Sequence, residues 1–448
     1  MLTNWNMEDV KLVIEVPGDE DYIVTTDDSK NSDRFISSAS VNASENGSSN
    51  PFGICGSRSY NFSIADVDDL LSPTNSQSKY YGKIKTGSKV KVYLLDTETG
   101  EWLPDGTYYI NSIQGGFSSG YCDEVSMSCK DRLDNIGSKA NPKMPCLRNI
   151  TVEDFVAYLM NPLAKGTDWN IDPSLGSKVL LYGITVGEKV RDTLNALAQF
   201  LQARISTDRN DVIWIKDATK IYGKSYTLPY DIVNNAKNIY DSSTDYSKIT
   251  VTYNVDGFKV TDVLLNDNSY SFQTGSNMAI NNIKFLTKAL SIQHIKLIYD
   301  RHRYKSTATI AAYTGHQDGL DGLVVNVEGE PIESCTLYVE GASIDKSTRE
   351  EVKVLYAEDQ GLTINLDIKY IIKQSEAQSL VNSLSNLINK MNRQITIKTL
   401  ASPHIDLGDE IVLEDDDFTQ TYKGKYRVIK YQTVHGQEYS NVLTLIRS

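Results

Sequence analysis

Apolar and polar residues alternate over short segments in the first third of the chain. In residues 89–94 (KVKVYL), Val90, Val92 and Leu94 would lie on one side of an extended strand, with the intervening residues on the other. The same alternation returns at 249–253 (ITVTY) and 364–368 (INLDI). Clusters of Gly, Asn, Ser and Asp separate such segments, as in a meander or barrel. The pattern predicts a mainly β protein.

Three segments carry helix signals instead. Each opens with a Ser or Thr followed three residues later by an acid or amide, a pair that satisfies free backbone amides at a helix start. These boxes begin at Thr151, Thr185 and Ser375, and Pro162 ends the first helix. The strongest apolar stripe follows the second box and consists of Val190, Leu194, Leu197, Leu201 and Ile205. We interpret all three helices as packing elements and not as cofactor sites.

The first and last β regions share a pattern of glycines and strands. The matching segments are 87–92 (GSKVKV) with 408–413 (GDEIVL), 106–110 (GTYYI) with 424–428 (GKYRV), and 125–129 with 442–446. Two explanations are open. The regions are two copies of one β module, or they are unrelated small antiparallel barrels that share common glycine-bounded spacing. Between them, residues 262–288 are polar and rich in Asn, and we interpret them as a peripheral loop.

Composition narrows the function classes. The chain of 448 residues is long enough for three or four units, and its 27 Tyr favour strands. A net charge of −13, from 45 basic and 58 acidic residues, gives no general attraction for nucleic acid or anionic lipid. The start lacks a signal-peptide pattern and no apolar run is long enough to cross a bilayer, so we expect a soluble protein made in a cytoplasm, without stable membrane insertion.

Candidate chemistry is sparse. Residues 116–120 (GFSSG) fit the Gly-x-Ser-x-Gly expression of a hydrolase, but they lie between strand-like segments, which favours a hairpin loop. The histidines lack metal-ligand spacing; they are His294, His302, His316, His404 and His435. The cysteines favour buried free thiols; they are Cys55, Cys122, Cys129, Cys146 and Cys335. We predict no catalytic, cofactor or metal site.

Several short motifs spread over most of the chain resemble the tail hub family of phages and contractile injection systems, which includes trimeric baseplate hubs and the hub portion of siphophage tail-tip proteins. The motifs are 81–84 (YGKI), 87–90 (GSKV), 106–113 (GTYYINSI), the helix at 192–203 with the strand 212–215 (VIWI), and the segments 364–370 and 405–411 (IDLGDEI) flanking the helix from Ser375. No spike repeat or lysin domain follows Val442, so we expect any piercing or wall-degrading activity on another polypeptide.

The resemblance implies a fold of class α+β: two tube-like antiparallel β-barrels per chain and a helical insert domain. We expect an N-terminal barrel at 1–140, an α/β insert at 141–230, and a β-rich region at 231–373 that holds the peripheral loop and the start of the second barrel. A helix at 374–393 and the completion of that barrel at 394–448 follow. Three chains would present six similar barrels, which matches a threefold tip to a sixfold tube.

The implied function is that of a homotrimeric structural adaptor, not an enzyme, without cofactors, assembled in the host cytoplasm and located at the tail tip or baseplate of the virion. Its expected partners are the tail tube or distal tail protein, a spike or tail-tip protein and the tape measure protein, with DNA only as passing cargo. A different class stays open: a carbohydrate-active enzyme or glycan-binding cell-surface protein, suggested by the many Tyr and four Trp.

One acidic run has two interpretations. Residues 414–417 include Asp415, Asp416 and Asp417, which fit a solvated hairpin tip. They also fit an acidic channel lining that would repel DNA phosphates. A Ca²⁺ site is disfavoured because four adjacent acids lack the spacing that lets ligands converge.

Overall fold

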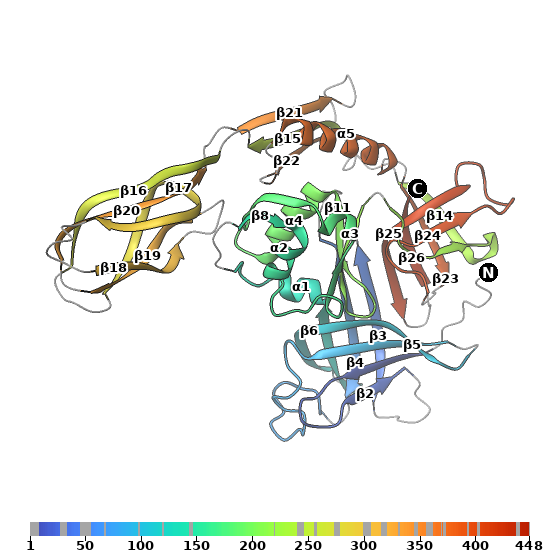
Figure 1. Ribbon diagram of the computed structural model, residues 1–448. Coiled ribbons are helices and arrows are strands. Elements are labelled where there is room, and N and C mark those ends of the chain that lie inside the picture. Colours follow the sequence, from blue (N-terminus) through green and yellow to red (C-terminus); the bar gives the residue numbers. More distant parts are fainter. Residues whose placement is uncertain are drawn as a thin grey trace.

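The structure is a computed structural model of the full chain. It describes residues 9–26, 34–44, 55–66, 69–96, 99–118, 121–142, 147–218, 220–239, 246–254, 258–272, 278–298, 306–314, 320–329, 332–344, 348–354, 362–368, 370, 373–391, 394–400, 404–435 and 440–447. Strands dominate these residues, and the helices gather in an insert and in one long C-terminal helix (Figure 1). The predicted class, mainly β with an α/β insert, is confirmed.

One sheet, antiparallel except for the parallel pair β13–β24, joins the two ends of the chain. Its paired order is β14-β23-β26-β25-β3-β4-β7-β6-β5-β1-β2, and β24 links β25 to β13. The early strands are β1 (Val10–Ile14), β2 (Tyr22–Thr25), β3 (Arg34–Ser44), β4 (Ser57–Asp66), β5 (Lys89–Leu95), β6 (Trp102–Ser118) and β7 (Tyr121–Lys130). The late ones are β13 (Ser225–Thr227), β14 (Val233–Ile239), β23 (Gln394–Leu400), β24 (Glu410–Leu413), β25 (Gly424–His435) and β26 (Ser440–Arg447).

Alternation sets which face of this sheet is packed. Val90 and Val92 are fully buried, as predicted, and they share one apolar core with residues from both ends of the chain, such as Val428 and Leu443. Strands β5, β1 and β2 continue the sheet beyond β6, and β24 and β13 continue it beyond the first half of β25. The described strand pairs form a path with two ends, so the closure of either predicted barrel stays a prediction.

The same sheet contains two matching four-strand units. The N-terminal unit is β3-β4-β7-β6 and the C-terminal unit is β14-β23-β26-β25, each in that paired order. Gly87 and Gly408 occupy equivalent turns with φ of +88° and +85°. Gly87 donates its backbone N–H to the carbonyl of Ile110 at 2.7 Å, and Gly408 donates to that of Val428 at 2.9 Å.

The two units also share irregularities. The β6–β7 pairing shifts register between Ile110 and Ser112, and the β25–β26 pairing shifts between Val428 and Lys430. A second register shift lies between residues 36 and 38 of β3 in its pairing with β4. The equivalent shift lies between residues 233 and 235 of β14 in its pairing with β23. Register shifts at equivalent positions are specific features that chance spacing does not reproduce. The predicted duplication is therefore confirmed in strand order and pairing.

The insert packs around a core of its own. Its elements are α1 (Arg132–Gly137), β8 (Leu147–Thr151), α2 (Val152–Leu159), β9 (Trp169–Ile171), α3 (Pro173–Gly176), β10 (Val179–Gly183), α4 (Val190–Leu201), β11 (Ala203–Thr207) and β12 (Ile213–Asp217). Leu133 of α1 belongs to this core, so the core begins before the predicted boundary at residue 141. Leu194 and Leu197 of α4 are fully buried, as the apolar stripe predicts.

Two of the three helices start as predicted and one does not. The Thr151 hydroxyl accepts the backbone N–H of Asp154 at 3.1 Å and caps α2, as predicted. The box predicted at Thr185 is wrong: α4 begins at Val190 because Gly187, with φ of +66°, breaks the turn. The Asp192 carboxylate instead accepts the backbone N–H of Lys189 at 3.0 Å. Helix α5 (Gln374–Met391) starts at residue 374, as predicted, one residue before the box at Ser375.

Two smaller sheets complete the chain. Strands β15 (Tyr246–Asn254), β21 (Thr348–Val354) and β22 (Leu362–Ile368) pair side by side, and α5 packs on them. A five-stranded sheet projects from the rest of the molecule (Figure 1). It consists of β16 (Phe258–Phe272), β17 (Met278–Ile298), β18 (Ser306–Thr314), β19 (Leu320–Gly329) and β20 (Ile332–Ile344). A short 3₁₀ turn, η1 (Tyr230–Ile232), precedes β14.

The interpretation of residues 262–288 as a loop is wrong. Most of this range lies in β16 and β17, and both strands pair with β20. Buried Leu264, Leu265 and Ile283 give the strands enough apolar surface despite their many Asn residues. Register shifts along these pairings accommodate positions that do not fit regular alternation.

Candidate functional site

The exposed side of the joined units is rich in hydroxyl and amide groups, and we call it the polar face. The strands alternate, so the side chains opposite the packed core are mostly Ser, Asn and Gln. The polar face consists of Ser38, Ser40, Asn42, Ser59, Asn61, Ser63, Ser112, Gln114, Ser126, Ser128 and Gln432, and part of it forms a groove of about 570 Å³. Across the strands, Ser40 faces Asn61, Asn61 faces Ser128, and Ser128 faces Ser112.

Side-chain hydrogen bonds link some of the polar groups on this side of the sheet. The hydroxyls of Ser63 and Ser126 lie 2.8 Å apart, and the Ser37 hydroxyl donates to the Glu124 carboxylate at 2.7 Å. The charged residues described on this side of the eight strands include Lys130, Lys237, Lys398, Lys430 and Glu124. The polar face therefore carries mainly hydroxyl and amide groups, and basic side chains outnumber acidic ones among its charges.

The chemistry of the polar face favours contact over catalysis. Its serines have no histidine among the described groove residues to activate them. Among the residues that the structure describes, no group of His, Cys, Asp or Glu side chains could hold a metal ion. Uncharged hydroxyls and amides form hydrogen bonds without the counterion release that makes cationic surfaces bind phosphates tightly.

The predicted acidic residues lie elsewhere, in the turn between β24 and β25. The Asp415 carboxylate accepts the backbone N–H groups of Tyr230 and Asp417 at 3.1 and 3.2 Å, and these bonds lower its pKa. The Asp416 carboxylate is exposed and lies 2.8 Å from the ammonium of Lys423. Asp417 is exposed. The run thus lies in the turn between β24 and β25, and its role as a solvated tip or as a channel lining stays a prediction.

The other sequence motifs carry no described chemistry. Residues 116–118 end β6, and β7 returns antiparallel to it, as the hairpin interpretation predicts. Cys55 and Cys129 are buried free thiols, and burial raises the pKa of both. His294 and His404 are exposed, while His302 and His316 lie outside the described residues. Within the part of the chain that the structure describes, no helix has the length and apolar character of a membrane span.

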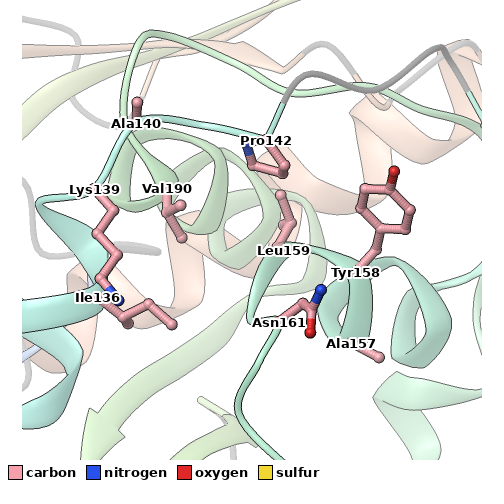
Figure 2. A pocket seen from close by; sticks show the side chains of 9 residues that line it. All are labelled: Ile136, Lys139, Ala140, Pro142, Ala157, Tyr158, Leu159, Asn161 and Val190. Carbon is pink, nitrogen blue, oxygen red and sulfur yellow. The ribbon is translucent and has the colours of Figure 1, made fainter.

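A second hollow, of about 470 Å³, lies on the insert beside α1, α2 and the start of α4 (Figure 2). Apolar side chains such as Ile136, Leu159 and Val190 form much of its wall, and Tyr158 stands at its rim. Lys139 is the charged side chain among its described lining residues. With no carboxylate, histidine or cysteine in that lining, the hollow supports no acid–base or metal chemistry.

A buried ionic cluster ties three parts of the chain together. Arg58 of β4, only 2% exposed, pairs with the carboxylate of Asp406 and donates to the hydroxyl of Tyr431 at 2.5 Å. Arg209, in the β11–β12 turn of the insert, donates to the Ile405 carbonyl at 2.6 Å. Burial alone would raise the pKa of Asp406, but the charges of Arg58 and Arg209 hold it below its ordinary value. We call these residues the Arg58 cluster.

Two further arginines fix the insert against the N-terminal unit. Arg132 of α1 pairs with Asp168 and lies 2.5 Å from the Asp211 carboxylate, which also accepts the hydroxyl of Tyr109 at 2.7 Å. Arg191 of α4 pairs with Asp134 and donates to the Cys55 carbonyl at 2.9 Å. These bonds join α1, α4 and the β11–β12 turn to β4 and β6. The sequence offered no signal for them because the partners are far apart along the chain.

Asp131 makes this junction sensitive to pH. Its carboxylate accepts the backbone N–H of Asp134 at 2.7 Å and that of Arg58 at 2.9 Å, and burial raises its pKa to about 7. Below about pH 7 the folded protein keeps the proton, whereas the unfolded chain loses it above the ordinary value of 3.8. Because the folded state then binds more protons, the free energy of unfolding falls as pH rises between these values.

We therefore expect Asp131→Asn to gain stability relative to the native chain as the pH rises. Between pH 5 and pH 8 the difference in free energy of unfolding should change by about 2 kcal/mol in favour of the variant. Urea unfolding of both proteins at several pH values measures this difference. A difference that stays constant with pH would show that Asp131 is ionised in the folded state throughout.

Searches of protein-family models and of curated proteins gave no match. Solved structures do match, and the chain shares its overall fold with two tail proteins, one of them from a prophage. A 43 kDa tail protein of prophage MuSo2 from Shewanella oneidensis aligns over 98% of both chains at 11% identity, with a TM-score of 0.52. The tail protein of Neisseria meningitidis MC58 aligns over 98% of this chain and 97% of its own at 9% identity, with a TM-score of 0.54. The predicted resemblance is confirmed for the fold.

Proposed function

We propose that this protein is a structural hub of a phage tail: a homotrimer at the tail tip or baseplate that joins a sixfold tail tube to a threefold tip and surrounds a passage for DNA. The observation that carries the proposal is the pair of matching units in one sheet. Three copies of the chain present six such units, so one end meets a sixfold partner with six similar surfaces while the rest keeps threefold symmetry. The shared fold with tail proteins supports the same role.

The polar face is the surface that we assign to the wall of the passage. The opposite face of the sheet is packed in the core, which leaves the hydroxyl-rich side available to line a ring. DNA in transit needs a wall that does not hold it, and Ser, Asn and Gln side chains do not displace the counterions of its phosphates. The proposed partners are the tail tube or distal tail protein, a spike or tail-tip protein and the tape measure protein. The role is structural, without catalysis.

The proposal is tested on the purified full-length chain. We expect a particle of three times the chain mass of 50.0 kDa by light scattering, and a threefold ring in negative-stain images. A monomer that binds or cleaves polysaccharide would instead support the carbohydrate-active alternative. A glycan array and a reducing-sugar assay on the same preparation distinguish the two classes.

A further inference from the structure

The duplication supplies an internal comparison for Tyr108 of β6. Its counterpart in the C-terminal unit is Tyr426 of β25, because each stands two residues after a matching glycine, Gly106 or Gly424. Both side chains lie in the shared apolar core, at 0% and 2% exposure. The Tyr426 hydroxyl donates to the Tyr422 carbonyl at 2.8 Å. The Tyr108 hydroxyl is just as buried, but it has no hydrogen-bond partner among the described residues.

The local backbone keeps the Tyr108 side chain in a defined place. A Cβ at Gly106 would lie 2.8 Å from the Tyr108 ring and 2.9 Å from its hydroxyl oxygen, so a larger residue there would displace the ring. Burial and the negative charge of Asp105 raise the pKa of Tyr108, so its hydroxyl keeps the proton and can donate. A buried donor of this kind normally has a partner, because folding removes it from bulk water.

Four more buried polar atoms near this hydroxyl have no hydrogen-bond partner in the described part of the chain. They are Nε and Nη1 of Arg58, Nε of Arg209 and Oδ2 of Asp105. The charges of Arg58 and Asp105 both act on the pKa of Tyr108, and an Asp105 carboxylate oxygen lies 3.8 Å from Nη2 of Arg209. These atoms and the Tyr108 hydroxyl therefore gather in one place, and we call them the unsatisfied group.

The ionic contacts around the unsatisfied group are too long for direct hydrogen bonds. Besides its 3.8 Å contact with Asp105, Arg209 places its Nε 3.6 Å from the carboxylate of Asp406. Direct N–H···O bonds span about 2.7–3.2 Å, and longer polar contacts are often bridged by a molecule between the two groups. The Asp406 side chain is 26% exposed, so the unsatisfied group meets solvent on that side.

The chemistry of the unsatisfied group selects its ligand. The arginine nitrogens and the Tyr108 hydroxyl donate, whereas the Asp105 oxygen accepts, so the ligand must both accept and donate hydrogen bonds. The two arginines already balance the carboxylates of Asp105 and Asp406, and an added ion would leave a buried net charge. Water meets both conditions, since a buried water molecule makes about three hydrogen bonds with polar neighbours.

We propose that ordered water molecules occupy the unsatisfied group and bridge β6 to Arg58 of β4 and to Arg209 of the insert. On β6 they accept from the Tyr108 hydroxyl and donate to the Asp105 carboxylate. The insert is thus held to the N-terminal unit through water at this place, while Arg209 reaches the C-terminal unit directly through the Ile405 carbonyl. The site lies within one chain, so it does not depend on the proposed homotrimer.

Two phenylalanine variants of the full-length chain test whether the Tyr108 hydroxyl is bonded. Tyr426→Phe removes a buried hydroxyl that has a protein partner and sets the scale. Tyr108→Phe removes the hydroxyl that we assign to water, and we expect both variants to raise the equilibrium constant of unfolding in urea about fivefold. An unchanged or lowered constant for Tyr108→Phe overturns the proposal, because losing a donor without any partner removes a buried unsatisfied group.

A crystal structure of the native chain, grown with sodium bromide and resolved well enough to show water, identifies the ligand. We expect electron density within about 3.2 Å of the Tyr108 hydroxyl and of Arg58 Nε, without an anomalous bromide signal. A bromide peak at this place would assign an anion and overturn the choice of water. Side chains bonded directly to one another, with no density between them, would overturn the site itself.

Discussion

Replacing Arg58 by methionine should lower the free energy of unfolding by about 3–5 kcal/mol, the usual cost of removing one partner of a buried ion pair. The change leaves the Asp406 carboxylate without its closest cation and the Tyr431 hydroxyl without its donor. Methionine fills a similar volume to arginine, so the variant leaves little cavity. The fall in the free energy of unfolding therefore measures mainly the lost ion pair and hydrogen bond. Urea unfolding of the full-length protein, followed by tyrosine and tryptophan fluorescence, measures it.

Two comparisons isolate the ion pair. Lys430→Met removes an exposed cation from β25, and we expect a change within about 0.5 kcal/mol. The double variant Arg58→Met with Asp406→Asn should recover part of the lost stability, because it no longer leaves the Asp406 carboxylate without its closest cation. If the losses of the two single variants simply add, the two residues do not stabilise the fold through each other.

Leu197→Asp should have a comparable or larger effect, of about 4 kcal/mol or more. Leu197 is fully buried in the core of the insert, where α4 packs against β11, and an aspartate there loses its hydration without gaining a partner. Gln199→Asp places the same side chain at a partly exposed position of the same helix and should cost about 1 kcal/mol or less. Thermal unfolding of both variants measures the contrast. Near-native stability of Leu197→Asp would mean that this helix face is not packed.

Residues close together in sequence predicted much of the fold. Alternation at Val90 and Val92 identified the packed face of the sheet, and the box at Thr151 identified the start of a helix. The duplication could be predicted because Gly87 and Gly408 hold turns that need a positive φ, which keeps glycine at both places. Such features follow from local backbone geometry, which the sequence records directly.

Other features depend on residues that the sequence keeps far apart. Arg58 and Asp406 are separated by 348 positions, and no sequence pattern links one to the other. The polar face was missed for a related reason. Its serines occupy ordinary alternate positions of several strands, and they form one surface only when β3, β4, β6 and β7 are paired in their final order. Residues 262–288 were predicted as a loop because their composition is polar and rich in Asn. Most of them form strands, because they pair with β20, which lies more than 40 residues further along the chain.

The pairing of β3 with β25 also has a consequence for the order of folding during synthesis. Strand β3 leaves the ribosome early, but its partner begins at Gly424, near the end of the chain. At about 5–20 residues per second, the edge of β3 waits tens of seconds for that partner. During this time the edge of β3 is uncovered, although it is paired with β25 in the finished protein. Neighbouring nascent chains on the same polysome could pair with it. Strand β25, one of the last to be translated, therefore covers the edge of β3. Prompt completion of the chain protects that edge from premature pairing with another copy.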